Sequence, residues 1–138
     1  MTLDYAGISP YLICADAEAE IAFLERAFGF RERLRATNPD GELMHAELRL
    51  GDRSVMLGGG GEKQKDDAMP RVLIHMYVDD VDALFRRAVE AGARPKSEPE
   101  DKREGDRRGD VVDPEGFWWS LSQHVRDVPP EEWGGKIA

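Results

Sequence analysis

Residues 113–121 read Asp-Pro-Glu-Gly-Phe-Trp-Trp-Ser-Leu, and this stretch decides how the rest of the chain is interpreted. The first four residues are typical of a tight turn, because proline presets the backbone at the second position and glycine tolerates the conformation needed at the fourth. A short apolar strand is predicted to follow. Side chains alternate across a strand, so those predicted to face the core are Phe117, Trp119 and Leu121. Trp118 and Ser120 then face the other side, where we expect the wall of a cavity.

Upstream of this stretch, the chain runs through one set of predicted elements and then repeats it. The first set starts with a strand over residues 8–14, in which Pro10 favours a place at a sheet edge. Asp16 is a typical helix N-cap and Gly29 a typical stop. Between them, apolar residues recur at the spacings of one helix face: Ala17, Ile21, Leu24 and Phe28. Three strands are predicted next, over residues 30–36, 43–50 and 53–57.

The second set follows a glycine-rich, charged linker over residues 59–70. A strand is predicted over residues 71–78, Asp80 caps a second helix, and Gly92 ends it. The apolar face of this helix consists of Val81, Leu84, Phe85 and Ala88. Residues 95–109 are almost free of large apolar side chains, so we expect a mobile loop around a short strand. Alternatively, residues 98–110 form a lid over the cavity. Strands over residues 110–113 and 117–122 close the set.

The two sets align at one constant offset. Cys14 aligns with Val78, Asp16 with Asp80, and Leu57 with Leu121, and each pair is 64 positions apart (78 − 14 = 64). The sequence therefore predicts an α+β fold of two tandem βαβββ modules within one domain over residues 1–138. The predicted bounds are about 7–58 for module one and 71–123 for module two, with a C-terminal tail over 124–138.

Composition narrows the class of protein. A chain of 138 residues with 41% hydrophobic and 34% charged residues fits a soluble globular domain. The net charge of -9 argues against nucleic acid or an anionic membrane as a partner, and no apolar run approaches membrane-spanning length. The single Cys14 excludes an intramolecular disulfide, and its apolar surroundings favour a buried hydrophobe over a nucleophile. Residues 1–7 lack the pattern of a signal peptide, so a cytoplasmic protein is expected.

Three stretches together carry a resemblance to a known family: residues 9–29, residues 75–92, and the turn and strand of residues 113–121. In combination they resemble the vicinal oxygen chelate superfamily, which includes glyoxalase I, extradiol dioxygenases and bleomycin-resistance proteins. The resemblance covers nearly the whole chain. It implies two curved half-barrels of mixed sheet that form a cup, commonly completed in a homodimer. In many members a divalent metal at the base of the cup is held by four side chains, one each from the first and last strands of both modules.

The family's four metal-ligand positions fall on Ser9, Met56, Leu73 and Ser120 in this sequence. The repeat supports this alignment, because 73 − 9 and 120 − 56 are both 64. Metal-binding members of the family carry His or Glu at these positions. Two hydroxyls, a thioether and an aliphatic group cannot hold a divalent ion. We therefore expect no metal and no other cofactor, which argues against the family's metal-dependent activities.

Other polar residues offer an alternative site. His45 and Glu47 lie two residues apart on one predicted strand, and His75 lies two residues beyond Leu73. These three are candidates for catalytic residues or metal ligands if the strands bring them together. The alternative is that His45 and Glu47 bond to neighbours or solvent and that His75 is a neutral, satisfied pocket residue. His124 falls past the last predicted strand, so a surface role is expected for it.

Aromatic residues dominate the face that carries the four emptied positions. Tyr11, Tyr77 and Trp118 share its parity, which suits a planar or apolar ligand held by stacking and a few hydrogen bonds. The open alternative is that these rings fill an interface, since interfaces are also enriched in Tyr and Trp. The residues predicted to contact the ligand are Ser9, Tyr11, His45, Glu47, Met56, Leu73, His75, Tyr77, Trp118 and Ser120.

Three functions compete on this basis. The leading hypothesis is a metal-free, small-molecule-binding homodimer of the bleomycin-resistance type, which sequesters or carries an apolar or aromatic ligand. The second is a metal-dependent lyase, isomerase or dioxygenase that uses His45, Glu47 or His75. The third is a structural dimer without a ligand, in which Trp118 and Tyr77 fill the cup.

Overall fold

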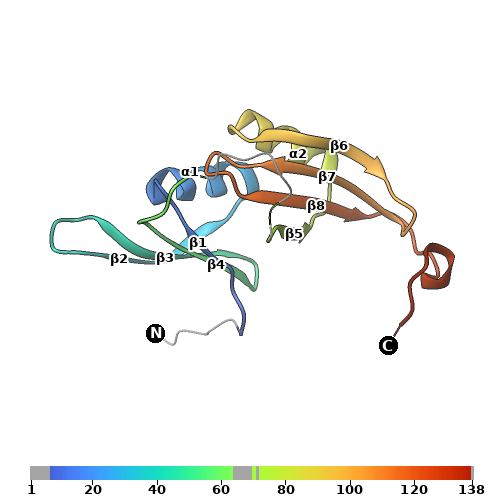
Figure 1. Ribbon diagram of the computed structural model, residues 1–138, viewed down its shortest axis with the longest axis horizontal. Coiled ribbons are helices and arrows are strands. Elements are labelled where there is room, and N and C mark those ends of the chain that lie inside the picture. The colour runs from blue at the N-terminus through green and yellow to red at the C-terminus, as the bar shows by residue number, and fades with distance from the viewer. Residues whose placement is uncertain (1–6, 64–69, 71, 138) are drawn as a thin grey trace.

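The computed structural model describes residues 7–63, 70 and 72–137. Each half of the chain folds into one helix and one four-stranded sheet, and the two sheets lie side by side with both helices on the same side of them (Figure 1). The first half consists of β1 (Tyr11–Ile13), α1 (Ala17–Phe28), β2 (Arg31–Thr37), β3 (Leu43–Leu50) and β4 (Arg53–Gly58). The second consists of β5 (Ile74–Tyr77), α2 (Val81–Glu90), β6 (Arg94–Asp101), β7 (Asp106–Val112) and β8 (Trp118–His124). A short 3-10 helix, η1 (Pro130–Trp133), follows.

The predicted repeat is confirmed by the register of the strands. The strand orders are β1-β4-β3-β2 and β5-β8-β7-β6, so the first strand of each module lies parallel to the last one, at a sheet edge. Tyr11 pairs with Met56 in the first sheet, and His75 pairs with Ser120 in the second. Tyr11 and His75 are 64 positions apart in the sequence, and so are Met56 and Ser120. The third strands depart from this offset, because five residues separate the paired ends Val112 and Trp118, whereas two separate Leu50 and Arg53.

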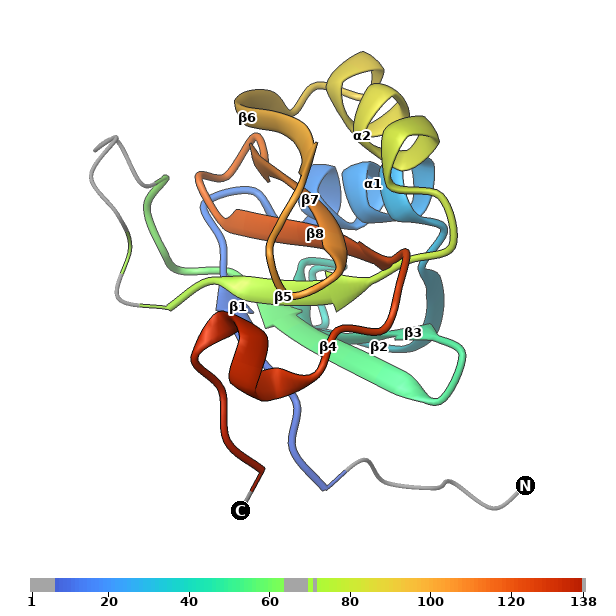
Figure 2. The ribbon, with the colours of Figure 1, turned by 90° about the vertical axis from the view of Figure 1, so that its right-hand side faces the viewer.

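The helices form where capping and apolar spacing predict them. The side chain of Asp16 accepts a hydrogen bond from the backbone N–H of Ala19, and Asp80 does the same for Ala83. Gly29 ends α1 with a φ of 80°, a conformation that glycine adopts without strain. Both helices pack against each other on the same side of the sheets (Figure 2).

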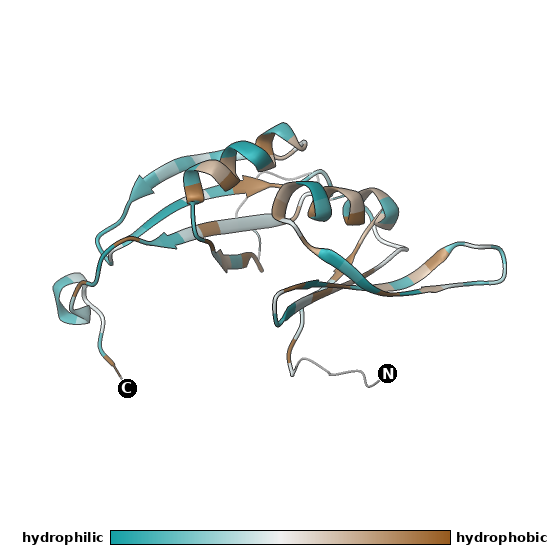
Figure 3. Ribbon diagram, turned by 180° about the vertical axis from the view of Figure 1, so that it is seen from behind, coloured by the Kyte–Doolittle hydropathy of each residue, from teal (hydrophilic) through white to brown (hydrophobic). Residues whose placement is uncertain are grey.

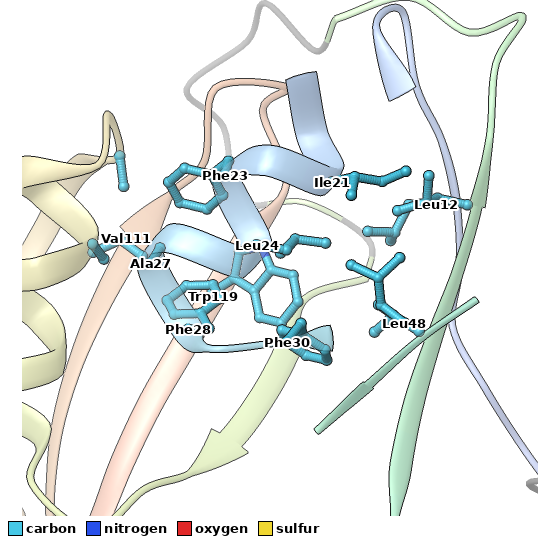
Figure 4. Close-up of a cluster of buried hydrophobic side chains, with 14 of the residues drawn as sticks. Leu12, Ile21, Phe23, Leu24, Ala27, Phe28, Phe30, Leu48, Val111 and Trp119 are labelled. Carbon is cyan, nitrogen blue, oxygen red and sulfur yellow. The ribbon is translucent and has the colours of Figure 1, made fainter. Parts of the chain in front are cut away.

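The core lies between the helices and the sheets and is shared by the two modules (Figure 4). Trp119 of β8 is fully buried, and its ring centroid lies 4.9 Å from that of Phe28 and 6.1 Å from that of Phe30. Leu24 in the middle of α1 is also fully buried. The predicted division of the last strand is confirmed for Trp119 and Leu121, which lie in the core, and for Trp118, which does not. Phe117, predicted in the core, is only partly buried and lines a cavity, and Ser120, predicted on the cavity side, is buried.

The Asp-Pro-Glu-Gly turn joins module two to module one. One carboxylate oxygen of Asp113 accepts the backbone N–H groups of Glu115 and Phe117 at 3.0 and 2.9 Å, and the other accepts the indole N–H of Trp119 at 2.9 Å. The carboxylate of Glu115 reaches the other module and accepts the backbone N–H groups of Ala15 and Asp16 at 2.7 and 3.1 Å. The turn therefore holds the start of α1 as well as its own strand.

The prediction of a mobile loop or lid over residues 95–109 is wrong. Residues 94–112 form the paired strands β6 and β7, which extend the second sheet to its outer edge. β6 is mostly hydrophilic and exposed (Figure 3), as suits an edge strand with solvent on its outer side. Charged side chains of the two strands are paired: Arg107 of β7 lies 2.8 Å from Asp82 of α2 and 3.2 Å from Asp101 of β6.

Smaller differences concern the ends of elements. The first strand of each module is shorter than predicted, because β1 and β5 pair over only three and four residues. Residues 64–69 of the predicted linker and Arg71 of the predicted fifth strand lie outside the described residues. His124 is the last residue of β8 and does not lie beyond the strand as predicted. In the described part of the chain, no helix is long and apolar enough to cross a membrane.

Candidate functional site

The four emptied ligand positions lie on the first and last strands or next to them. The hydroxyl of Ser9 is hydrogen-bonded to that of Ser54. Met56 pairs with Tyr11 and Glu47, Ser120 is buried and pairs with His75 and Asp110, and Leu73 precedes β5 with 38% of its surface exposed. This donor set does not fit a divalent metal, because it contains no imidazole and no carboxylate.

Module one places Tyr11 against His45. The Tyr11 hydroxyl lies 3.0 Å from Nδ1 of His45, and the ring centroids are 5.6 Å apart. Gly58, at the end of β4, makes room for this contact, since a Cβ there would lie 3.0 Å from the Tyr11 hydroxyl. Tyr11 remains 47% exposed. The pair is therefore anchored at the phenol end and accessible along the ring.

Glu47 forms part of a charged cluster on the same sheet. It is 5% exposed and accepts a hydrogen bond from Arg33 at 2.7 Å, with Nε of Arg49 3.7 Å away. A bulge in β2 sets Arg33 and Leu34 opposite this part of β3, which turns the guanidinium of Arg33 toward Glu47. Paired in this way, Glu47 is a structural ion-pair partner.

In module two, a first-strand ring is again held by a hydrogen bond, but the residues are different. Nε2 of His75 lies 2.9 Å from the hydroxyl of Ser122, which is fully buried, and the His75 ring meets the Tyr77 ring edge to face at 4.9 Å. Tyr77 is 63% exposed and donates its hydroxyl to Asp106 at 2.8 Å. This hydrogen bond raises the pKa of Tyr77, so the phenol keeps its proton.

Asp106 also holds His124. Nδ1 of His124 lies 3.0 Å from Asp106, and Nε2 lies 2.7 Å from Asp127. Hydrogen bonds to Asp106 and then to Asp127 raise the pKa of His124, which favours the doubly protonated ring between two carboxylates. His124 thus binds the chain beyond β8 to the second sheet.

Trp118 lines the surface from β8 with its polar edge fixed. The indole N–H donates to Asp110 at 3.1 Å, and Nζ of Lys96 lies 5.2 Å from the ring centroid. Fixing both the edge and one face of the ring leaves its remaining surface as a rigid apolar platform.

Two cavities lie at the junction of the modules. One has a volume of about 470 Å³ and is lined by Tyr11 and Trp118, with Phe117 and Pro10 beside them. The other has a volume of about 870 Å³ and is lined by His75, Tyr77 and Ser54, among others. Both volumes fall in the usual range for small-molecule sites. Of the three aromatic residues predicted to share one face, Tyr11 and Trp118 line the first cavity and Tyr77 lines the second.

The structure does not bring the predicted His45, Glu47 and His75 together. His45 and Glu47 lie in the first sheet, whereas His75 lies in the second. Over residues 7–63, 70 and 72–137, no three or more His, Cys, Asp or Glu side chains are arranged to hold a metal ion. Burial raises the pKa of Cys14 to about 12, so this thiol stays protonated.

Several residues of the site were missed by the sequence reasoning. Gly58 and Ser122 could have been found, because they lie 64 positions apart and two residues beyond Met56 and Ser120. Asp106 was hidden in the segment predicted as a loop, and Asp110 was predicted only as the first residue of a strand. Arg33 could not have been found, because a bulge shifts the strand parity on which the prediction depends.

Comparison with known proteins gives consistent matches along the chain. The model of the Glyoxalase/Bleomycin resistance protein/Dioxygenase superfamily matches residues 2–121. The uncharacterized protein Mb0911c of Mycobacterium bovis is 42% identical over 134 residues, which cover 91% of this chain and 88% of that protein.

Solved structures give the same picture. The crystal structure of TioX from Micromonospora sp. ML1 is 30% identical with a TM-score of 0.67, and the match covers 90% of this chain and 100% of that one. The fosfomycin resistance protein FosX from Mesorhizobium loti is 21% identical with a TM-score of 0.67, covering 91% and 95% of the two chains. At that identity the similarity to FosX concerns the fold alone.

Proposed function

This chain belongs to the glyoxalase/bleomycin resistance protein/dioxygenase superfamily, and from that premise we propose that it is a metal-free protein that binds a planar, largely apolar small molecule. Membership alone leaves the activity open, because the superfamily name covers both enzymes and resistance proteins. The observation that carries the proposal is the cavity of about 470 Å³ lined by Tyr11, Phe117 and Trp118, whose lining contains no imidazole and no carboxylate.

The residues that line the cavity indicate which class of ligand it binds. Tyr11, Phe117 and Trp118 supply aromatic surface, and Pro10 and Val72 add aliphatic surface. Aromatic rings gain most from a planar partner that can lie against them. The ligand is therefore a planar ring system, and the protein sequesters or carries it.

A matched pair of probes tests this selection. We expect 2-naphthol to bind in calorimetric titration, and decahydro-2-naphthol, which has the same carbon skeleton and hydroxyl but is not planar, to bind about tenfold more weakly or not at all. Equal affinity for both probes, or no binding of 2-naphthol, would reject the proposed ligand class.

Replacing Trp118 with alanine should weaken 2-naphthol binding about tenfold or more, because it removes a wall of the cavity. Trp118 is only partly buried, so the melting temperature should change little. Trp133→Ala, in η1 and outside the cavity, is the matched control and should bind as the wild type does. A large loss of stability with unchanged binding would instead place Trp118 in the core.

An enzyme is the second candidate, and the larger cavity is the observation in its favour. His75 and Tyr77 line about 870 Å³ at the junction of the modules, with their polar atoms held by Ser122 and Asp106. An enzyme of the metal-dependent classes needs an ion. Elemental analysis of protein purified without chelators should give less than about 0.1 equivalent of Fe, Ni, Zn or Mn, since the donor set is unsuitable. A stoichiometric metal would favour the enzyme.

We also propose that the protein works as a homodimer in the cytoplasm, with no nucleic acid or membrane partner. Exposed apolar side chains on and beside the first strands β1 and β5 support the dimer: Ile8, Tyr11, Ile13, Val72 and Tyr77. A purely structural dimer is less well supported, because it predicts a cup filled by Trp118 and Tyr77, whereas each of these residues lines a cavity.

A further inference from the structure

Both modules contain the same local arrangement of a first-strand ring and a last-strand residue. In each module a ring on the first strand lies against the residue of the last strand that occupies the same place in the repeat. Tyr11 and His75 occupy equivalent positions 64 residues apart, and so do Gly58 and Ser122, which pair with the residues two places further along the first strands. The hydroxyl of Tyr11 lies over Gly58, and Nε2 of His75 bonds to Ser122.

The contacts at Gly58 are tight, so that a side chain at this position would push its neighbours away by a few tenths of an ångström. A Cβ at this position would lie 3.0 Å from the Tyr11 hydroxyl and 3.1 Å from the backbone oxygen of Met44. Glycine is a poor strand residue, and within a strand it often marks a close approach of another group. At Gly58, the close group is the phenol end of Tyr11, held there by His45 at 3.0 Å.

Both anchored rings border cavities. Tyr11 lines the cavity of about 470 Å³, and His75 lines the one of about 870 Å³. Their exposed surfaces face the space, while their polar ends are held from the sheet. A ring fixed before the ligand arrives loses little conformational freedom on binding, so its contacts contribute more to affinity.

We propose that the last strand of each module positions a first-strand ring as the ligand-orienting wall of its cavity, with Gly58 and Ser122 as the positioning residues. Neither residue touches the ligand. Gly58 acts by leaving space for Tyr11 over the strand, and Ser122 acts by fixing the imidazole of His75. This proposal rests on the proposed binding function for its ligand-dependent part only.

Gly58→Ala is the deciding variant because its effects on stability and on binding separate. Alanine suits a strand better than glycine, so the melting temperature should be close to that of the wild type. The added methyl displaces the Tyr11 hydroxyl, and affinity for 2-naphthol should fall about fivefold to tenfold. Gly59→Ala is the matched control, because a Cβ at the neighbouring Gly59 would meet nothing within 4 Å, and it should bind as the wild type does.

A readout without ligand tests the anchors themselves. The chain has three histidines, so their imidazole signals can be separated by NMR. Gly58→Ala and Tyr11→Phe should both shift the His45 signal and leave that of His75 in place, whereas Ser122→Ala should shift His75 and leave His45.

The outcomes distinguish the two proposals. If the wild type binds 2-naphthol and Gly58→Ala binds it equally well, the positioning role is rejected while the binding function remains. If the wild type does not bind 2-naphthol, the binding function fails, and the NMR shifts still decide whether the rings are anchored. Unchanged imidazole signals in all three variants overturn the inference in either case.

Discussion

Replacing Leu24 with aspartate should abolish cooperative folding of the protein. Leu24 is fully buried in the middle of α1, among the side chains that join the helix to both sheets (Figure 4). An ionised carboxylate without a partner costs several kcal/mol in such a place, against a total stability of roughly 5–15 kcal/mol for a domain. The new acid would also lie one helical turn from Glu20, which is already buried.

Circular dichroism during heating and size-exclusion chromatography measure this effect. The variant should show no cooperative transition and should elute as aggregate or unfolded chain. Val89→Asp, the same kind of change on the half-exposed face of α2, is the control and should stay folded. If the Leu24→Asp protein melted like the wild type, α1 could not bury the face that carries Leu24.

Much of the fold could be predicted because several local signals agreed. Asp16 and Asp80 cap the two helices as their positions before apolar periodic stretches indicated. The alternation after the Asp-Pro-Glu-Gly turn placed Trp119 and Leu121 in the core correctly. The repeat was visible because the parallel first and last strands keep one register in both modules.

The outer hairpin escaped prediction for a physical reason. β6 carries charged or polar residues at nearly every position and two prolines, so neither period-2 alternation nor an apolar run marks it. Its pairing with β7 comes from backbone hydrogen bonds, which leave no trace in the side-chain pattern. Sequence reasoning therefore missed Asp106 along with most of the hairpin.

The candidate site was only partly predictable for a related reason. Strand parity predicted that Tyr11, Tyr77 and Trp118 face one cavity, and Tyr11 and Trp118 line the same one whereas Tyr77 lines another. Parity does not give the distance between two sheets, however, and His45 and His75 belong to different ones. The partner of Tyr11 was not predictable either, because it depends on the space that Gly58 leaves.

The acidic cluster at the junction of the modules is the least expected part of the core. Glu20 of α1 is 1% exposed, and its carboxyl group lies against the buried side chain of Asp113. Asp113 and Glu115, both buried, are its acidic neighbours. Burial, with these neighbours, raises the pKa of Glu20 from 4.5 to about 10, so the folded protein holds this side chain protonated at neutral pH.

Glu20→Gln should therefore stabilise the protein at neutral and alkaline pH. The unfolded chain releases the Glu20 proton above about pH 4.5, whereas the folded chain keeps it up to about pH 10. The stability that the protonated acid gives is complete below the lower value and is lost as the pH rises toward the higher one. Glutamine has a similar shape and no proton to take up, so the variant avoids this loss.

The gain in the free energy of unfolding arises because the pKa of Glu20 is higher in the folded chain than in the unfolded chain. The free energy of unfolding of the variant should exceed that of the wild type by little near pH 5, and by an amount that grows as the pH rises toward 9. Urea unfolding between pH 5 and pH 9 measures the difference, and Glu25→Gln, an exposed change on the same helix, should show no such trend. A difference between Glu20→Gln and wild type that does not change with pH would mean that Glu20 is ionised in the folded protein, and that the junction of the modules holds a buried charge.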